Sequence, residues 1–156
     1  MGFRLVQSGG AVTDPTVINV TASGTINNNN PVDWNRDADY LVSPTTSSST
    51  TTMVFGIAKS YAQGESDTFV KVIPFVQGQL WEADCANAAT TGQIGVRQAL
   101  SASDRSVIHN QGTDNVNGTG IFLPYYMVGS TSGSGKLVGK FIYTDDVVGQ
   151  NQTTRI

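Results

Sequence analysis

The sequence predicts an all-β protein, and three observations lead to that prediction. Charged residues make up only 13% of the 156 residues, against roughly 25% in an average soluble domain. Two glutamates and four lysines leave few of the residues that usually cover exposed helix faces, whereas Thr, Val and Gly are abundant. Apolar runs of strand length also alternate with Gly-rich joints through much of the chain, which is typical of a small barrel or sandwich.

Most of the strands are expected after residue 53. The run "TFVKVIPFV" has apolar residues on both faces, which predicts a strand buried on both sides. Pro74 cannot donate a hydrogen bond to a ladder, so it marks an edge or a bulge. The expected strands, in order, are 53–61, 68–76, 79–83, 92–97, 105–109, 121–128 and 136–143, with "AQGESD" at 62–67 and "GSTSGSG" at 129–135 as turns.

The first third of the chain differs in composition, and we expect an extended, mostly irregular N-terminal arm over residues 1–52. Its segments "INNNNP" and "SPTTSSSTTT" are polar, turn-prone and poor in core-forming residues. Residues 33–42 between them are expected to form a loop that pins Trp34 and Tyr40 onto a neighbour, with a short helix as the alternative. Residues 53–156 then form a small β-barrel or β-tulip-like domain with a short C-terminal tail.

Charge and hydropathy exclude two classes of partner. The net charge is −3 and the pI is about 4.8, and no basic run is present to neutralise phosphates, so we expect no nucleic-acid binding. The longest apolar stretches are far shorter than a membrane span, and the N-terminus lacks a signal-peptide core. A single cysteine allows no disulfide within the chain, so stability is expected from packing or assembly.

Two motifs that could carry chemistry do not fit their patterns. "GSTSGSGK" at 129–136 resembles a phosphate loop, but Ser130 stands where glycine is required and Leu137 where Ser or Thr is required. We therefore interpret it as a hairpin turn. Cys85 and His109 are the only possible thiolate–imidazole pair, yet nothing beside Cys85 predicts a lowered thiol pKa. A small buried thiol is the simpler interpretation.

Glu82 and Asp84 lie two residues apart, which places them on the same side of a strand. Paired carboxylates could serve acid–base hydrolysis of sugars, but we expect a solvated strand face opposite Trp81 and Ala83. The acidic segments have no calcium-loop spacing, and one histidine with one cysteine gives no zinc site. We therefore predict that the chain is not an enzyme, with no catalytic, cofactor-binding or metal-binding residues and no cofactor.

The central stretch resembles tailed-phage capsid decoration proteins, also called head-stabilising or cement proteins, which carry a small β-tulip or β-barrel domain. The resemblance covers about residues 53–143 and is one of pattern. The matching segments are "FGIA" at 55–58, "VKVIP" at 70–74, "LWEA" at 80–83, a glycine-led strand at 92–96, and a closing strand pair at 121–128 and 136–143.

The resemblance implies a structural protein of the virion that binds the major capsid protein on the outer capsid surface of a bacteriophage, often as a homotrimer. The stretch "FRLVQ" alternates apolar and polar residues and could add a strand to a sheet edge on another subunit. On this interpretation, deleting residues 2–14 weakens capsid binding while the domain stays folded. The candidate capsid-contact arm consists of Phe3, Arg4, Leu5, Val6 and Gln7.

Two other functions remain open from the residues alone. A carbohydrate-binding β-module of a fibre or surface structure would use Trp34, Trp81, Tyr125 and Tyr126 as stacking platforms. A small hydrolase would use Glu82 and Asp84. Other structural phage roles, such as a tail or neck component, share the same sequence features.

Overall fold

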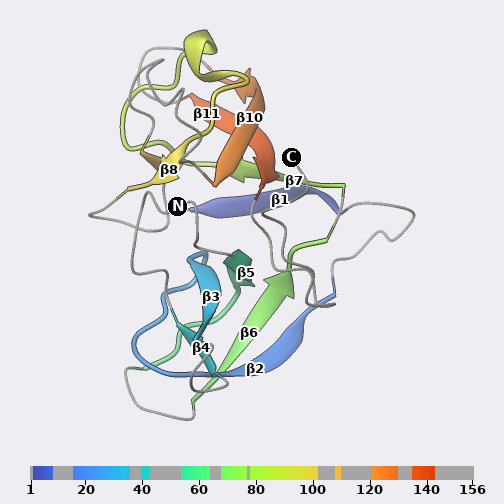
Figure 1. The fold of residues 1–156 in the computed structure, drawn as a ribbon, viewed down its shortest axis with the longest axis vertical. Helices are drawn as coiled ribbons and strands as arrows, with labels where there is room; N and C mark the ends of the chain where they lie inside the picture. The colour runs from blue at the N-terminus through green and yellow to red at the C-terminus, as the bar shows by residue number, and fades with distance from the viewer. Residues whose placement is uncertain are drawn as a thin grey trace.

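The computed structural model describes residues 2–8, 16–35, 40–42, 54–63, 68–76, 78–101, 108–109, 121–129 and 135–142. Strands make up the described elements apart from one short 3-10 turn, η1, so the all-β prediction is confirmed (Figure 1). The elements are β1 (Phe3–Ser8), β2 (Ile18–Ala22), β3 (Pro31–Asn35), β4 (Tyr40–Val42), β5 (Val54–Ala58), β6 (Thr68–Pro74), β7 (Gln79–Ala83), η1 (Thr91–Gln93), β8 (Ala99–Leu100), β9 (Ile108–His109), β10 (Phe122–Val128) and β11 (Lys136–Phe141).

Five strands close into a small barrel in the order β2-β4-β3-β5-β6, with β6 pairing back to β2. The ladder between β2 and β6 is long and antiparallel, running from Ile18↔Val72 to Ala22↔Thr68. Among the described residues, the seam between β2 and β4 is the shortest in the ring, with the single parallel pair Ala22↔Leu41. The barrel occupies the lower half of Figure 1.

A four-stranded antiparallel sheet, in the order β1-β7-β11-β10, lies above the barrel in Figure 1. β10 and β11 pair antiparallel, from Phe122↔Phe141 to Val128↔Lys136, as expected for the two strands of a hairpin, and residues 130–134 between them lie outside the described residues. The first strand of the chain, β1, pairs with β7 at the other edge of this sheet. Strands β8 and β9 form a separate two-stranded pair.

The structure differs from the expectation of a mostly irregular N-terminal arm. Residues 3–42 supply one strand of the sheet and three of the five barrel strands, so strand pairing runs across the expected boundary at residue 52. The physical reason is a short alternation: Ile18, Val20 and Ala22 face the barrel interior in a segment whose other residues are polar. Trp34 does pack on a neighbour, with its ring 5.1 Å from that of Phe55, but from strand β3 and not from a loop.

The predicted strand at 92–97 is also wrong. Thr90 donates its backbone N–H to Oε1 of Gln93 at 2.8 Å, and the backbone N–H of Gln93 returns to the Thr90 carbonyl at 3.2 Å. This closes the turn η1, and Gly95 then adopts a positive φ of 77°, a conformation that favours glycine. The segment therefore reverses direction where the apolar residues alone indicated an extended chain.

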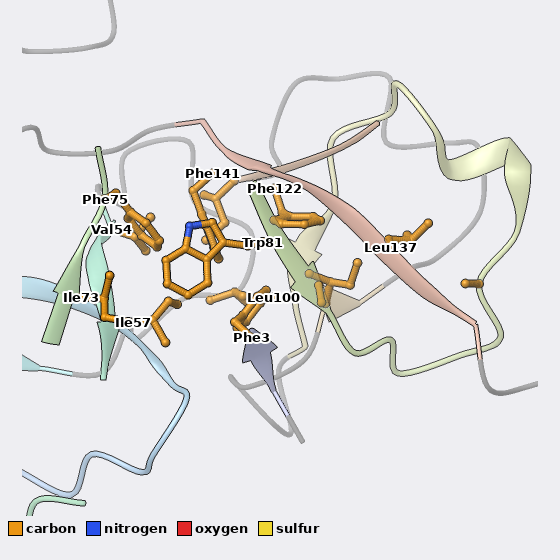
Figure 2. Close-up of a cluster of buried hydrophobic side chains, with 14 residues drawn as sticks. Phe3, Val54, Ile57, Ile73, Phe75, Trp81, Leu100, Phe122, Leu137 and Phe141 are labelled. Carbon is orange, nitrogen blue, oxygen red and sulfur yellow. The ribbon is translucent and has the colours of Figure 1, made fainter. Parts of the chain in front are cut away.

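Two hydrophobic clusters divide the interior between them. One fills the barrel and includes Phe55, Ala58, Val70 and Val72. The other joins the barrel to the sheet: Figure 2 shows Trp81 between the barrel residues Val54, Ile57, Ile73 and Phe75 on one side and Phe122 and Leu137 on the other. Strands β5 and β6 send residues into both clusters. The prediction that the "TFVKVIPFV" strand is buried on both sides is correct around Val72 and Ile73, which enter different clusters, and wrong for its first half, where Phe69 and Lys71 are exposed.

Candidate functional site

Glu82 and Asp84 lie on one side of β7, as their spacing predicted, but they are not a solvated face. Their residues are only 7% and 9% exposed. Arg4, on β1, binds Glu82 through a forked contact of 2.8 Å and 3.3 Å. Lys136, at the start of β11, lies 2.8 Å from Asp84 and 3.4 Å from Glu82. We call Arg4, Glu82, Asp84 and Lys136 the β7 charge cluster.

The backbone places this cluster by strand register. Arg4 stands opposite Glu82 on one flank of β7, and Leu137, next to Lys136, stands opposite Ala83 on the other flank. The backbone N–H of Gly2 also donates to a carboxylate oxygen of Asp84 at 2.5 Å. Each acid of β7 is therefore held from both neighbouring strands, and the prediction that these acids face water is wrong because sequence spacing does not reveal which cations the adjacent strands bring.

The electrostatics of the cluster favour charged acids. The hydrogen bond from Arg4 is the largest cause that holds the pKa of Glu82 below its ordinary value, and Lys136 adds to it. Burial by itself raises the pKa of Asp84, but the hydrogen bonds from Lys136 and Gly2 outweigh it and leave that pKa lowered. The Asp84 carboxylate in turn raises the pKa of Lys136. A general acid needs a pKa near the working pH, so the arrangement suits a structural clamp better than sugar hydrolysis.

The cluster predicts an acid-dependent loss of stability. Because both acids have lowered pKa values when folded, their contribution is present above the unfolded values of about 3.9 and 4.3 and is lost as the pH falls through the folded values. We expect the double variant Glu82→Gln/Asp84→Asn to lose about 2 kcal/mol at pH 7, since the partner cations are partly exposed. Thermal unfolding from pH 7 to pH 3 should then show a smaller drop in Tm for the variant than for the wild type. Parallel drops would contradict the role of the cluster, and Lys140→Gln, outside the cluster, is the control.

Lys136 is the lysine that a phosphate loop at 129–136 would use to bind phosphate. Its ammonium group forms ion pairs with the carboxylates of Asp84 and Glu82, so it faces acids of the sheet. Residues 130–134 of the glycine-rich stretch lie outside the described residues. The contacts of Lys136 are those of an internal ion pair.

Cys85 follows β7 and is half-buried. Burial raises the pKa of its thiol to about 11, which fits the interpretation as a small packed thiol. The backbone of Cys85 forms a parallel bridge with Ile108, the residue before His109. The side chain of His109 lies outside the described residues. A raised thiol pKa is the opposite of what thiolate catalysis uses.

We expect Cys85 to react slowly with alkylating reagents. At pH 7.5 the thiolate fraction for a pKa of about 11 is smaller than that of a free thiol by about two orders of magnitude, and burial also restricts access. Alkylation by iodoacetamide, followed by mass spectrometry, should be correspondingly slow in the folded protein and fast in urea. A folded-state rate equal to that of free cysteine would contradict this environment.

The four proposed aromatic platforms do not form one surface. Trp81 is 1% exposed at the centre of the core, so it cannot stack on a ligand, and Trp34 is half-buried against Phe55. Tyr125 and Tyr126 are adjacent and exposed on β10. A register shift between Pro124 and Tyr126 lets two consecutive residues face solvent, where strict alternation would bury one.

The N-terminal residues predicted as a contact arm form a strand within their own chain. Phe3 is 1% exposed and packs against Phe122 and Phe141, with ring centroids 5.9 Å and 5.0 Å apart. Leu5 is half-buried against the same cluster, and Val6 is 45% exposed at a register shift in β1. The backbone of Gln7 pairs with Leu80. The alternation predicted the strand correctly, but it did not indicate that the partner sheet is internal.

Sequence reasoning missed the two aromatic side chains that are most exposed among the described residues. Phe69 on β6 is 72% exposed and Tyr61, shortly after β5, is 57% exposed. The alternation in "TFVKV" contained the signal, because burying Val70 and Val72 turns Phe69 and Lys71 outward. Phe69 and Tyr61 are thus large aromatic side chains left exposed on or beside the barrel strands.

Within the described part of the chain, no three His, Cys, Asp or Glu side chains gather as a metal site. In that same part, no helix has the length and apolar character needed to cross a membrane. No known protein family, curated protein or solved structure matches the chain.

Proposed function

We propose that this chain is a viral capsid decoration protein that binds the outer surface of the major capsid lattice and stabilises the head. The observation that carries the proposal is the contrast between its acids and its apolar side chains. The acids of the candidate site are engaged in internal ion pairs, whereas Phe69, Tyr61 and Val17 are exposed on strands or beside them. Exposed apolar side chains suit binding to another protein surface, and acids held in ion pairs are poorly suited to catalysis.

The major capsid protein is the proposed partner, and the virion surface is the proposed location. A homotrimer would place several copies of one surface on neighbouring capsid subunits, so that avidity adds to each weak contact. Binding to the assembled lattice alone would then stabilise that lattice by mass action. The sequence resemblance over 53–143 and the all-β fold support this proposal.

Capsid melting tests the proposal directly. Expanded, undecorated capsids are incubated with the full chain, and both co-sedimentation and calorimetric melting of the capsids are measured. We expect the chain to co-sediment at a saturating ratio and to raise the capsid melting temperature. A chain that neither binds nor shifts the melting temperature is not a decoration protein for that lattice.

A carbohydrate-binding module is the second candidate, because of one feature of β10. Tyr125 and Tyr126 are exposed side by side, and Nζ of Lys140 lies 5.9 Å from the Tyr125 ring centroid. Exposed aromatic rings stack on sugar faces. A glycan array with the wild type and Tyr125→Ala would show binding that the variant loses; no binding on the array would remove this candidate.

A further inference from the structure

Gln98, the residue before β8, is buried where the chain joins the sheet, and it is 0% exposed. Its backbone N–H donates to the Phe122 carbonyl at 2.7 Å. Its carbonyl accepts the backbone N–H groups of Ile121 and Phe122 at 3.0 Å and 3.1 Å. The backbone of Gln98 is therefore fully paired at the start of β10, and its polar side chain lies in the interior.

The side-chain amide of Gln98 is paired at one end only. Nε2 donates to the carbonyl oxygen of Val96 at 3.0 Å. Oε1 is buried and accepts no hydrogen bond from the residues that the structure describes, although an amide oxygen has two lone pairs. Turning the amide over would set Oε1 against the Val96 oxygen and leave Nε2 as an unpaired donor. The Val96 carbonyl thus fixes the orientation of the amide, and the unpaired atom is an acceptor.

Gln79 provides a comparison, because its side chain is also buried, at 6% exposed, and all of its polar atoms are paired. Its Oε1 accepts the backbone N–H of Val76 at 3.1 Å and the indole N–H of Trp81 at 3.4 Å. Its Nε2 donates to the Pro74 carbonyl at 3.2 Å. Each glutamine thus donates to one backbone carbonyl, and the difference between them is the acceptor: Gln98 Oε1 has two free lone pairs where Gln79 Oε1 has none.

The burial and chemistry of Gln98 Oε1 define what can bind it. Native proteins pair nearly all buried acceptors with protein groups or ordered water, since an unpaired one loses the hydrogen bonds it made in the unfolded chain. The ligand must be small, because Gln98 is 0% exposed, and it must donate a hydrogen. A metal ion would require several oxygen ligands, usually with carboxylates among them, and the described residues contain no such cluster. A water molecule meets both requirements.

We propose that Gln98 Oε1 is the binding site of an internal water molecule that forms part of the folded protein. The water donates one hydrogen to Oε1. The Val96 carbonyl oxygen lies 3.0 Å from Nε2 of the same amide and keeps a second lone pair, so we expect it to accept the other hydrogen. Internal waters of this kind usually pair with buried groups that the chain itself leaves unsatisfied. The inference does not depend on the proposed function, and its test involves no capsid.

Two measurements on the full wild-type chain test the proposal, with Gln79 as the control in the same molecule. A high-resolution crystal structure should contain a water oxygen about 2.8 Å from Gln98 Oε1 and none bound to Gln79 Oε1. In solution, water-selective NOE and ROE spectra of the ¹³C,¹⁵N-labelled chain should show cross-peaks of opposite sign between water and the side-chain protons of Gln98. Such signs distinguish a long-lived bound water from proton exchange, and Gln79 should show no such pair of cross-peaks.

The variant Gln98→Met adds a test of which atom holds the water, because methionine has a similar length and no amide oxygen. We expect the water to be lost from the crystal structure of this variant. A water kept at the same place would show that other groups hold it, which overturns the proposal. The proposal also falls if a protein donor binds Oε1 in the wild-type crystal structure, or if neither wild-type measurement finds a water there. If Gln98→Met does not fold, the two wild-type measurements decide.

Discussion

Gly139→Ala is expected to lower the free energy of unfolding by about 3 kcal/mol, although it adds only one methyl group. Gly139 lies in β11 between two partners, opposite Trp81 on β7 and Pro124 on β10. A Cβ at this position would collide with the carbonyl oxygen of Leu123 and come within 2.7 Å of the Leu123 carbonyl carbon and of Cα of Pro124. These are backbone atoms of a paired strand, so relief requires β10 to move away from β11.

Gly24→Ala is the matched control for this prediction. A Cβ on Gly24 would meet nothing within 4 Å, but its φ of 79° disfavours alanine. Strain of this kind costs about 1 kcal/mol. Urea unfolding followed by fluorescence of the buried Trp81 measures both variants. If Gly139→Ala costs no more than Gly24→Ala, then the close approach of β10 to β11 is not a constraint on the fold.

The sequence was most informative where a strand is long and its apolar pattern is local. The expected strands at 79–83, 121–128 and 136–143 correspond closely to β7 (Gln79–Ala83), β10 (Phe122–Val128) and β11 (Lys136–Phe141). Each has consecutive apolar or aromatic residues that no helix pattern explains. For these elements, side-chain propensity and tertiary pairing favour the same conformation.

The candidate site depends on contacts that no local pattern contains. Glu82 is bound by Arg4, which lies 78 residues away in sequence, and by Lys136 on the other neighbouring strand, β11. Spacing alone predicted that Glu82 and Asp84 share a face, and that part is confirmed. Their burial could not be predicted, because it depends on β1 and β11 flanking β7. The barrel strands of the first third were missed for the same reason: β4 spans three residues, and its stability comes from its neighbours.

The N-terminal strand β1 depends most on contacts with distant strands, and the second major prediction concerns it. We expect Phe3→Ala to lower the free energy of unfolding by about 3–4 kcal/mol, as is usual for a buried phenylalanine. Phe3 is 1% exposed and contacts the rings of Phe122 and Phe141. Phe141 in turn stacks on Phe75 of the barrel side at 4.3 Å, so a cavity at Phe3 loosens the core that joins sheet and barrel.

Deleting residues 2–8 should cost more than Phe3→Ala, because it also removes Arg4 and the Gly2 N–H from the acids of β7 and exposes the β7 edge. Val6→Ala is the control within the same strand: Val6 is 45% exposed, and its variant should stay within about 0.5 kcal/mol of the wild type. If residues 2–8 were a free arm, their deletion would weaken capsid binding and leave the Tm of the chain unchanged. Thermal unfolding of the deletion variant in the absence of any capsid therefore decides between an arm that reaches a partner and a strand that completes its own sheet.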